Sequence, residues 1–315
     1  MFRRNQPLVI PHEEHHFVFS PDIAPALKVK SGSTVRFETS PAPAERLLAA
    51  QEAGGTDGWM AASDTARINA VTGPLYVNGA RPGDALRVEI LEITTLEWGW
   101  SSALPGFGLL TDNVHEPFLG RIPIKNNTVW LTEALQVPLR PMIGCFGVAP
   151  ASGVTSALAP PMPWAGNYDL LQMRAGATVW LPVQVEGALL SLGDLHAAMG
   201  EAEATSIAIE CAGSVTVRVE VERDRSLLMP RIVVDGRLTT IGLAERGEWG
   251  VARRHASDQM FNYLTEERGL TEVDAFLYIT AAGDLTFGGP AGAVALMTVP
   301  LAPLDVRDQH RPVSA

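Results

Sequence analysis

The sequence has few of the residues on which several specialised protein classes depend. It contains only two cysteines in 315 residues, Cys145 and Cys211, so we expect reduced, buried thiols and no disulfide framework. It contains only three lysines, and its net charge is −11. This balance argues against binding to a nucleic-acid backbone and to an anionic membrane surface.

Long apolar runs are absent as well. No window of the sequence reaches the length of a membrane span. The basic start, residues 1–7, is not followed by an apolar stretch, so we expect no secretory signal. A hydrophobic content of 46% still allows the whole length to fold around a core. These features favour a soluble protein of the cytoplasm.

Strand patterns are present along much of the chain. The 29 glycines and 23 prolines are spread evenly, which is typical of short strands joined by turns. Apolar and polar residues alternate over residues 34–38, 86–90 and 215–222. Successive side chains of a strand point to opposite faces, so each segment predicts a strand with one buried face. The sequence therefore predicts a mainly β, antiparallel body.

Helical patterns are concentrated towards the end of the chain. Residues 45–52 predict one short helix, and residues 253–268 predict a better one that ends at Gly269. Thr271 is placed as the cap of a further helix. We divide the chain into a catalytic β-body, residues 1–225, and a smaller α+β portion, residues 226–315. The last strand, at about residues 292–300, is expected to return to the body.

One segment concentrates residues that carry chemistry. Residues 194–203 hold one imidazole and three carboxylates, and apolar residues flank the segment on both sides. Asp194 and His196 are two positions apart, so on an extended segment they point the same way and a cation can bridge them. Zinc accepts both kinds of ligand, and calcium or another divalent ion remains an alternative. A solvated turn at the end of a strand would also explain the segment.

Six segments of the chain carry recognisable motifs: residues 69–84 (NAVTGPLYVNGARPGD), 98–100 (WGW), 105–110 (PGFGLL), 142–151 (MIGCFGVAPA), 166–169 (GNYD) and 193–203 (GDLHAAMGEAE). In their order, and in their approximate spacing from about His15 to Pro303, they resemble the acetamidase/formamidase family. The resemblance implies an antiparallel β-sandwich with a smaller α+β portion, assembled into a homo-oligomer. It also implies a metal-dependent amidase that converts small amides to carboxylate and ammonia.

The resemblance, together with residue chemistry, suggests roles for the acidic residues. Glu203 matches a family position and is our first candidate for the general base and acid, with Glu201 as the second. The family usually has aspartate where this chain has Glu201. Asp169 is a candidate third ligand or a residue that orients His196, and an Asx-turn is its alternative. Asn167 is assigned to substrate binding.

Other residues are weaker candidates. Trp100 and Phe107 lie in or beside loops rich in glycine and proline, where they would line a small substrate pocket or cover the ends of the sandwich. Asp57, in a glycine-rich segment expected to be a flexible loop, and His15 and His16 are each more simply explained as solvated residues. Cys145 has no neighbouring cation to lower its pKa, so we interpret it as a packed thiol, in contrast to the Cys-Glu-Lys amidases.

A second class of function remains open at this stage. A non-catalytic β-sandwich that binds a small molecule would have the same strand pattern. Such a protein has no need for His196 between carboxylates, so the acidic cluster favours the enzyme.

Overall fold

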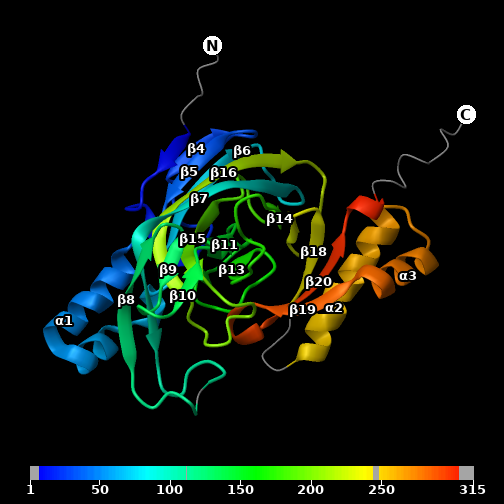
Figure 1. Ribbon diagram of the computed structural model, residues 1–315. Coiled ribbons are helices and arrows are strands. Elements are labelled where there is room, and N and C mark those ends of the chain that lie inside the picture. The colour runs from blue at the N-terminus through cyan, green and yellow to red at the C-terminus, as the bar shows by residue number, and fades with distance from the viewer. Residues whose placement is uncertain (1–6, 111, 244–247, 305–315) are drawn as a thin grey trace, which may run out of the picture.

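The structure is a computed structural model that describes residues 7–110, 112–243 and 248–304 (Figure 1). The strands in the first half are β1 (Leu8–Ile10), β2 (His15–His16), β3 (Val18–Phe19), β4 (Leu27–Lys30), β5 (Thr34–Glu38), β6 (Val71–Asn78), β7 (Ala85–Ala103), β8 (Phe118–Lys125), β9 (Thr128–Trp130), β10 (Gln136–Pro138) and β11 (Met142–Gly147). Those in the second half are β12 (Thr155–Ser156), β13 (Ala165–Asn167), β14 (Thr178–Pro182), β15 (Leu190–Ala198), β16 (Ile209–Glu222), β17 (Arg231–Val234), β18 (Arg237–Gly242), β19 (Asp284–Gly288) and β20 (Val294–Pro300). The helices are α1 (Ala42–Ala62), α2 (Trp249–Asn262) and α3 (Glu272–Ala282), with short helical turns η1 (Thr65–Arg67), η2 (Tyr263–Glu267) and η3 (Pro290–Gly292).

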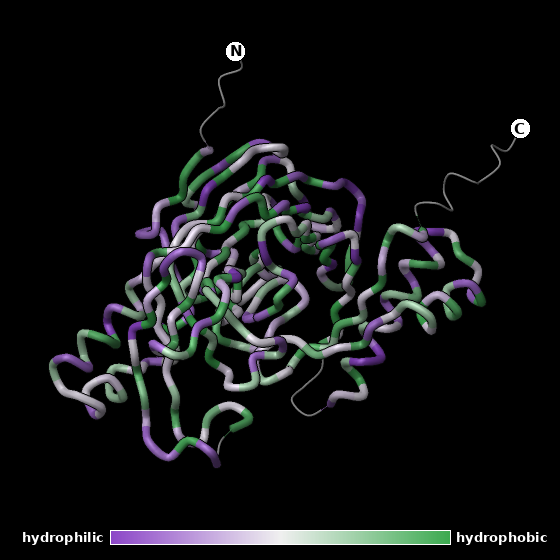
Figure 2. Tube along the Cα trace, viewed as in Figure 1, coloured by the Kyte–Doolittle hydropathy of each residue, from purple (hydrophilic) through white to green (hydrophobic). Residues whose placement is uncertain are grey.

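The body is built around the antiparallel pair β7 and β16. These strands pair along most of their lengths, and β16 also joins β5 and β15. Val215, Val217 and Val219 are fully buried in one core with side chains of β5, β7 and β15. Hydrophobic and hydrophilic stretches are intermixed along the trace of the body, as Figure 2 shows. The expected antiparallel β-sandwich is confirmed, and the three strands predicted from alternation are present.

The C-terminal portion adds α2 and α3 to the strands β17–β20. Helix α2 packs on β18 and β20 through Ala252, Ala256 and Met260. A Cβ on Gly242 would lie 1.9 Å from the carbonyl oxygen of Ala252, so the strand comes this close to the helix only because residue 242 is glycine. Strand β20 pairs with β18 and β19, and β17 joins this group to β14 of the body. In Figure 1 the portion lies at the right of the body.

One prediction about the helices is confirmed, and one about a loop was wrong. The cap at Thr271 is confirmed, because its side chain accepts a hydrogen bond from the backbone amide of Asp274. The prediction of a flexible loop around Asp57 was wrong, because α1 continues to Ala62 through a kink at Gly55. Trp59 is buried beside Trp100, and this packing outweighs the low helix propensity of the glycines.

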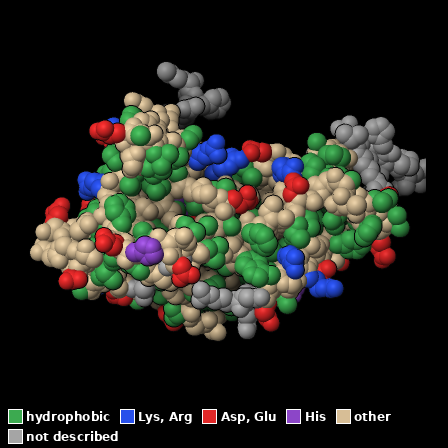
Figure 3. Space-filling model, turned by 60° about the horizontal axis from the view of Figure 1, so that its bottom comes forward, with side chains coloured by type: hydrophobic (Ala, Val, Ile, Leu, Met, Phe, Trp, Pro, Cys, Tyr) green, Lys and Arg blue, Asp and Glu red, His purple; other side chains and the backbone are tan. Residues whose placement is uncertain are grey.

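Among the described residues, no helix is both long and apolar enough to span a bilayer. On the face shown in Figure 3, acidic and basic side chains are interspersed.

Candidate metal centre

Strand β15 carries the first two residues of the site. Asp194 interrupts the strand with a left-handed backbone, φ 55°, and its amide donates to the carbonyl of Ala70. His196 follows, 1% exposed. The Nε2 atom of His196 lies 3.7 Å from Oδ2 of Asp194. The structure therefore brings together the two residues that the spacing had paired, although Asp194 does not have regular strand geometry.

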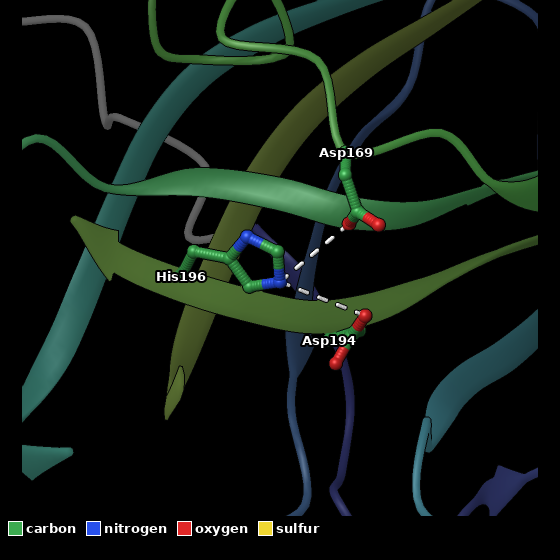
Figure 4. A group of neighbouring side chains, drawn as sticks. All are labelled: Asp169, Asp194 and His196. Atoms are coloured by element: carbon green, nitrogen blue, oxygen red, sulfur yellow. Dashed lines mark ion pairs between the residues drawn. The ribbon is translucent and has the colours of Figure 1, made fainter. Parts of the chain in front are cut away.

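Asp169 approaches the same ring nitrogen from another segment. It follows β13, is 1% exposed, and places Oδ1 3.6 Å from Nε2 of His196. Figure 4 shows both aspartates directed at this nitrogen. The Oδ1 atom of Asp169 is buried and has no hydrogen-bond partner, which is costly unless an ion satisfies it. A Cβ on Gly144 would lie 2.6 Å from Oδ1 of Asp169, so this position is limited to glycine.

Two glutamates complete the cluster. The Oε2 atom of Glu210 lies 3.4 Å from Nε2 of His196, because His196 and Glu210 are register partners on β15 and β16. Glu203 is 5% exposed, and its carboxyl group interacts with that of Asp169 and raises the pKa of the aspartate. The ligand atoms fall into two groups within 4.8 Å, Asp169–Asp194–His196 and His196–Glu203–Glu210. Sequence reasoning missed Glu210: a carboxylate between apolar Ile209 and Cys211 signals a buried acid but does not indicate which residue it contacts.

The charges in this cluster strongly perturb one another. Burial, together with the nearby carboxylates, raises the pKa of Glu203 and of Glu210 to about 8, and that of Asp169 well above its usual range. Burial alone would lower the pKa of His196, but the carboxylates of Glu210, Asp169 and Asp194 raise it well above its usual value. A divalent cation would relieve this crowding of negative charge, because metal ligands bind in their deprotonated form. The donor set of one imidazole and several carboxylates therefore fits a divalent metal.

Three buried side chains, those of Asn69, Cys145 and Asn167, form a polar layer next to Asp194. The Nδ2 atom of Asn69 donates to Oδ2 of Asp194 at 2.9 Å, and the thiol of Cys145 contacts the same oxygen at 3.3 Å. The thiol also contacts Oδ1 of Asn167 at 3.2 Å. Burial, and then the charge of Asp194, raises the pKa of Cys145 well above its usual value. Both cysteines are free, and Cys145 is enclosed, as expected of a packed thiol, whereas Cys211 is only partly buried.

A small pocket reaches the cluster from one side. It is lined by Asp194 and Glu210, by Trp98 and Trp100, and by the first turn of α1. Trp100 thus lines the same pocket as Asp194 and Glu210. Phe107 is 48% exposed and lines a different hollow, together with Thr205 and Ile207. Asn167 lies in the supporting layer and does not line either hollow.

The remaining candidates lie apart from this cluster. Glu201 and Asp57 are exposed. His15 bonds to the carbonyl of His12, and His16 lies 3.2 Å from the hydroxyl of Ser191. None of Glu201, Asp57, His15 and His16 belongs to either group of possible metal ligands among the described residues.

Comparison with known proteins decides the family. A sequence profile of the Acetamidase/Formamidase family matches residues 4–159 and 153–286. The chain belongs to this family. The crystal structure of an acetamidase from Bacillus halodurans superimposes with a TM-score of 0.85 at 33% identity, covering 95% of this chain and 99% of that one.

Curated relatives are more distant. An acetamidase of Mycolicibacterium smegmatis is 27% identical over 277 residues, covering 65% of this chain and 65% of the relative. A formamidase of Methylophilus methylotrophus is 25% identical over 225 residues, covering 51% of this chain and 53% of the relative. The chain thus spans about two thirds of the length of the first relative and about half of the length of the second.

Proposed function

We propose that this protein is a metal-dependent amidohydrolase that cleaves small linear amides, such as formamide and acetamide, to carboxylate and ammonia. The observation that carries the proposal is the buried His196 with Asp169 and Asp194 at one ring nitrogen, beside a small pocket. The names of the relatives, acetamidase and formamidase, support amides as the substrate class.

His196, Asp194 and Asp169 would hold the cation. The imidazole nitrogen favours zinc over calcium, which prefers oxygen ligands alone. When bound, a divalent ion polarises an amide oxygen and lowers the pKa of a coordinated water. The unpartnered Oδ1 of Asp169 supports its place among the ligands.

Glu210 and Glu203 would divide the remaining work. Glu210 lines the pocket, so its carboxylate is placed to take a proton from water and pass one to the departing nitrogen. The backbone amide of Ala208 donates to Oε1 of Glu210 at 3.1 Å and fixes the orientation of the group. Glu203, whose carboxyl group interacts with that of Asp169, would hold that ligand in place. Trp98 and Trp100 would exclude water from the acyl group of the substrate.

An assay of ammonia release tests this function. Formamide, acetamide, propionamide and urea would be supplied to the protein before and after treatment with a chelator, and then after zinc is restored. We expect release from at least one linear amide, loss of release with the chelator, and recovery with zinc. A protein that binds an amide without releasing ammonia in any of these states would instead be the non-catalytic binding protein.

The proposal also covers the oligomeric state of the protein and its location in the cell. We propose a homo-oligomer, as the family resemblance implies, and a cytoplasmic location, which the composition of the sequence favours. Large apolar side chains are exposed on α3 and β19, and they include Val273, Phe276, Leu277, Leu285 and Phe287. Light scattering coupled to size-exclusion chromatography would give the mass in solution, and a mass of about 34 kDa would contradict the oligomer.

A further inference from the structure

The turn between β19 and β20 contacts both halves of the candidate metal centre through its backbone. The amide of Gly289 donates to the carbonyl of Asp169 at 3.2 Å, and the amide of Ala291 donates to the carbonyl of Glu203 at 3.2 Å. The amide of Gly292 donates to the carbonyl of Ala202 at 2.8 Å. One short turn thus bonds to two segments that are distant in sequence and carry two carboxylates of the cluster.

The residues that receive these bonds have unfavourable backbone conformations. Asp169, Ala202 and Glu203 have φ values of 43°, 64° and 39°. Residues with a Cβ rarely adopt this left-handed region, and they remain there only when the surroundings hold them. The bonds from residues 289–292 supply part of that restraint at each of the three positions.

Two glycines at the start of the turn leave little room for a side chain. A Cβ on Gly288 would lie 2.5 Å from Cδ2 of Leu170, the residue after Asp169. A Cβ on Gly289 would lie 2.6 Å from Cγ2 of Val294. The turn therefore packs directly against the segment that carries Asp169.

We propose that the β19–β20 turn, residues 289–292, is a positioning element that aims Asp169 and Glu203 at His196. The C-terminal portion is then part of the metal centre, although it supplies none of the clustered side chains. This inference rests on the proposed metal dependence and extends it to how tightly the metal is held.

Gly292→Ala tests the role of the turn. Its φ is 72°, so alanine strains the turn, but the added Cβ meets only ordinary contacts, the nearest at 3.6 Å. We expect the dissociation constant for zinc, measured by competition with a chelator, to rise at least about tenfold, as for other outer partners of metal ligands. The d–d absorption spectrum of the cobalt-substituted protein should also change, because it reports the geometry of the ligands.

Gly32→Ala is the matched control. Gly32 has φ 86° and nothing within 4 Å of an added Cβ, and it bonds to Val219, towards the far end of β16 from Glu210. We expect a similar loss of thermal stability in both variants, with zinc affinity and the cobalt spectrum unchanged in the control. Equal zinc affinity and identical spectra in both variants would overturn the proposal.

A measurement on the unaltered protein keeps the test decisive if Gly292→Ala does not fold. Coupling between two sites is reciprocal, so zinc should stabilise the turn if the turn stabilises the ligands. Hydrogen exchange of the amides in residues 288–293 should slow when zinc is added, while exchange around Gly32 should not change. Unchanged exchange in 288–293 would overturn the inference alone, whereas a protein that binds no zinc would overturn the proposed function with it.

Discussion

The Nε2 atom of His196 lies 3.4 Å from Oε2 of Glu210 on the neighbouring strand. The antiparallel register of β15 and β16 makes the two residues partners. Glu210 also lines the pocket, so a single carboxylate connects the candidate ligand set to the place where a substrate would bind. This relationship gives Glu210 a role that its position in the sequence alone did not indicate.

Glu210→Gln should lower turnover at least about 100-fold, the range usual for losing a general base. Zinc should remain bound, because the amide keeps the size of the side chain and His196 keeps its other partners. Ammonia release and zinc content would be measured on the same preparation.

Glu203→Gln and Glu201→Gln should be compared with Glu210→Gln. The carboxyl group of Glu203 interacts with that of Asp169 and belongs to one group of possible ligands, so Glu203→Gln should weaken zinc binding more than it slows the zinc-loaded enzyme. Exposed Glu201 should tolerate the change with near-normal activity. If Glu203→Gln is inactive with zinc bound while Glu210→Gln is active, the two roles are reversed and the expectation from the sequence was right.

The stability of the zinc-free protein should fall as the pH rises. The folded-state pKa values of Glu203 and Glu210 are raised to about 8. Between the ordinary value of 4.5 and about 8, the unfolded chain therefore releases protons that the folded chain keeps, which favours unfolding. The raised pKa of His196 acts in the same direction above 6.5. Thermal melts with a chelator at pH 5 and pH 8 would measure the loss, and a rising Tm would contradict it.

Cys145→Ala should retain most of the turnover. The buried thiol has a raised pKa and is therefore a poor nucleophile, and its removal should cost about 1 kcal/mol through a small cavity and lost contacts. Denaturant unfolding and ammonia release would be measured together. A folded, zinc-loaded variant without activity would show that the thiol takes part in the chemistry.

Trp100→Phe should alter the preference among acyl groups. Trp100 lines the pocket beside Glu210, so a smaller ring should favour longer amides and change KM more than kcat. Phe107→Leu is the control, because Phe107 lines a separate hollow. Rates for formamide, acetamide and propionamide would separate the two, and an equal effect of both substitutions would contradict the assignment.

The sequence predicted the elements whose signals are local. Alternation identified β5, β7 and β16, and a capping residue identified the start of α3 at Thr271. The second half of α1 was not predicted, because the burial of Trp59 against strands distant in sequence overrides the glycines before it.

The same distinction holds within the candidate site. Asp194 and His196 could be paired from spacing, and Asp169 and Glu203 from the family motifs. Glu210 and Asn69 could not be placed, because their contacts depend on strand register and on the packing of separate segments. The contacts of the β19–β20 turn, residues 289–292, could not be predicted either, because backbone amides form these hydrogen bonds and the identity of the side chains does not indicate them.

The most direct test of the account is His196→Ala, measured for zinc stoichiometry and for ammonia release from acetamide on the same samples. His12→Ala, at a surface histidine, is the matched control. The account predicts about one zinc per chain and activity in the unaltered protein and the control. In folded His196→Ala it predicts a loss of zinc affinity beyond the roughly 10–100-fold that outer partners cost, together with loss of turnover. Full zinc content and normal turnover in His196→Ala would contradict it.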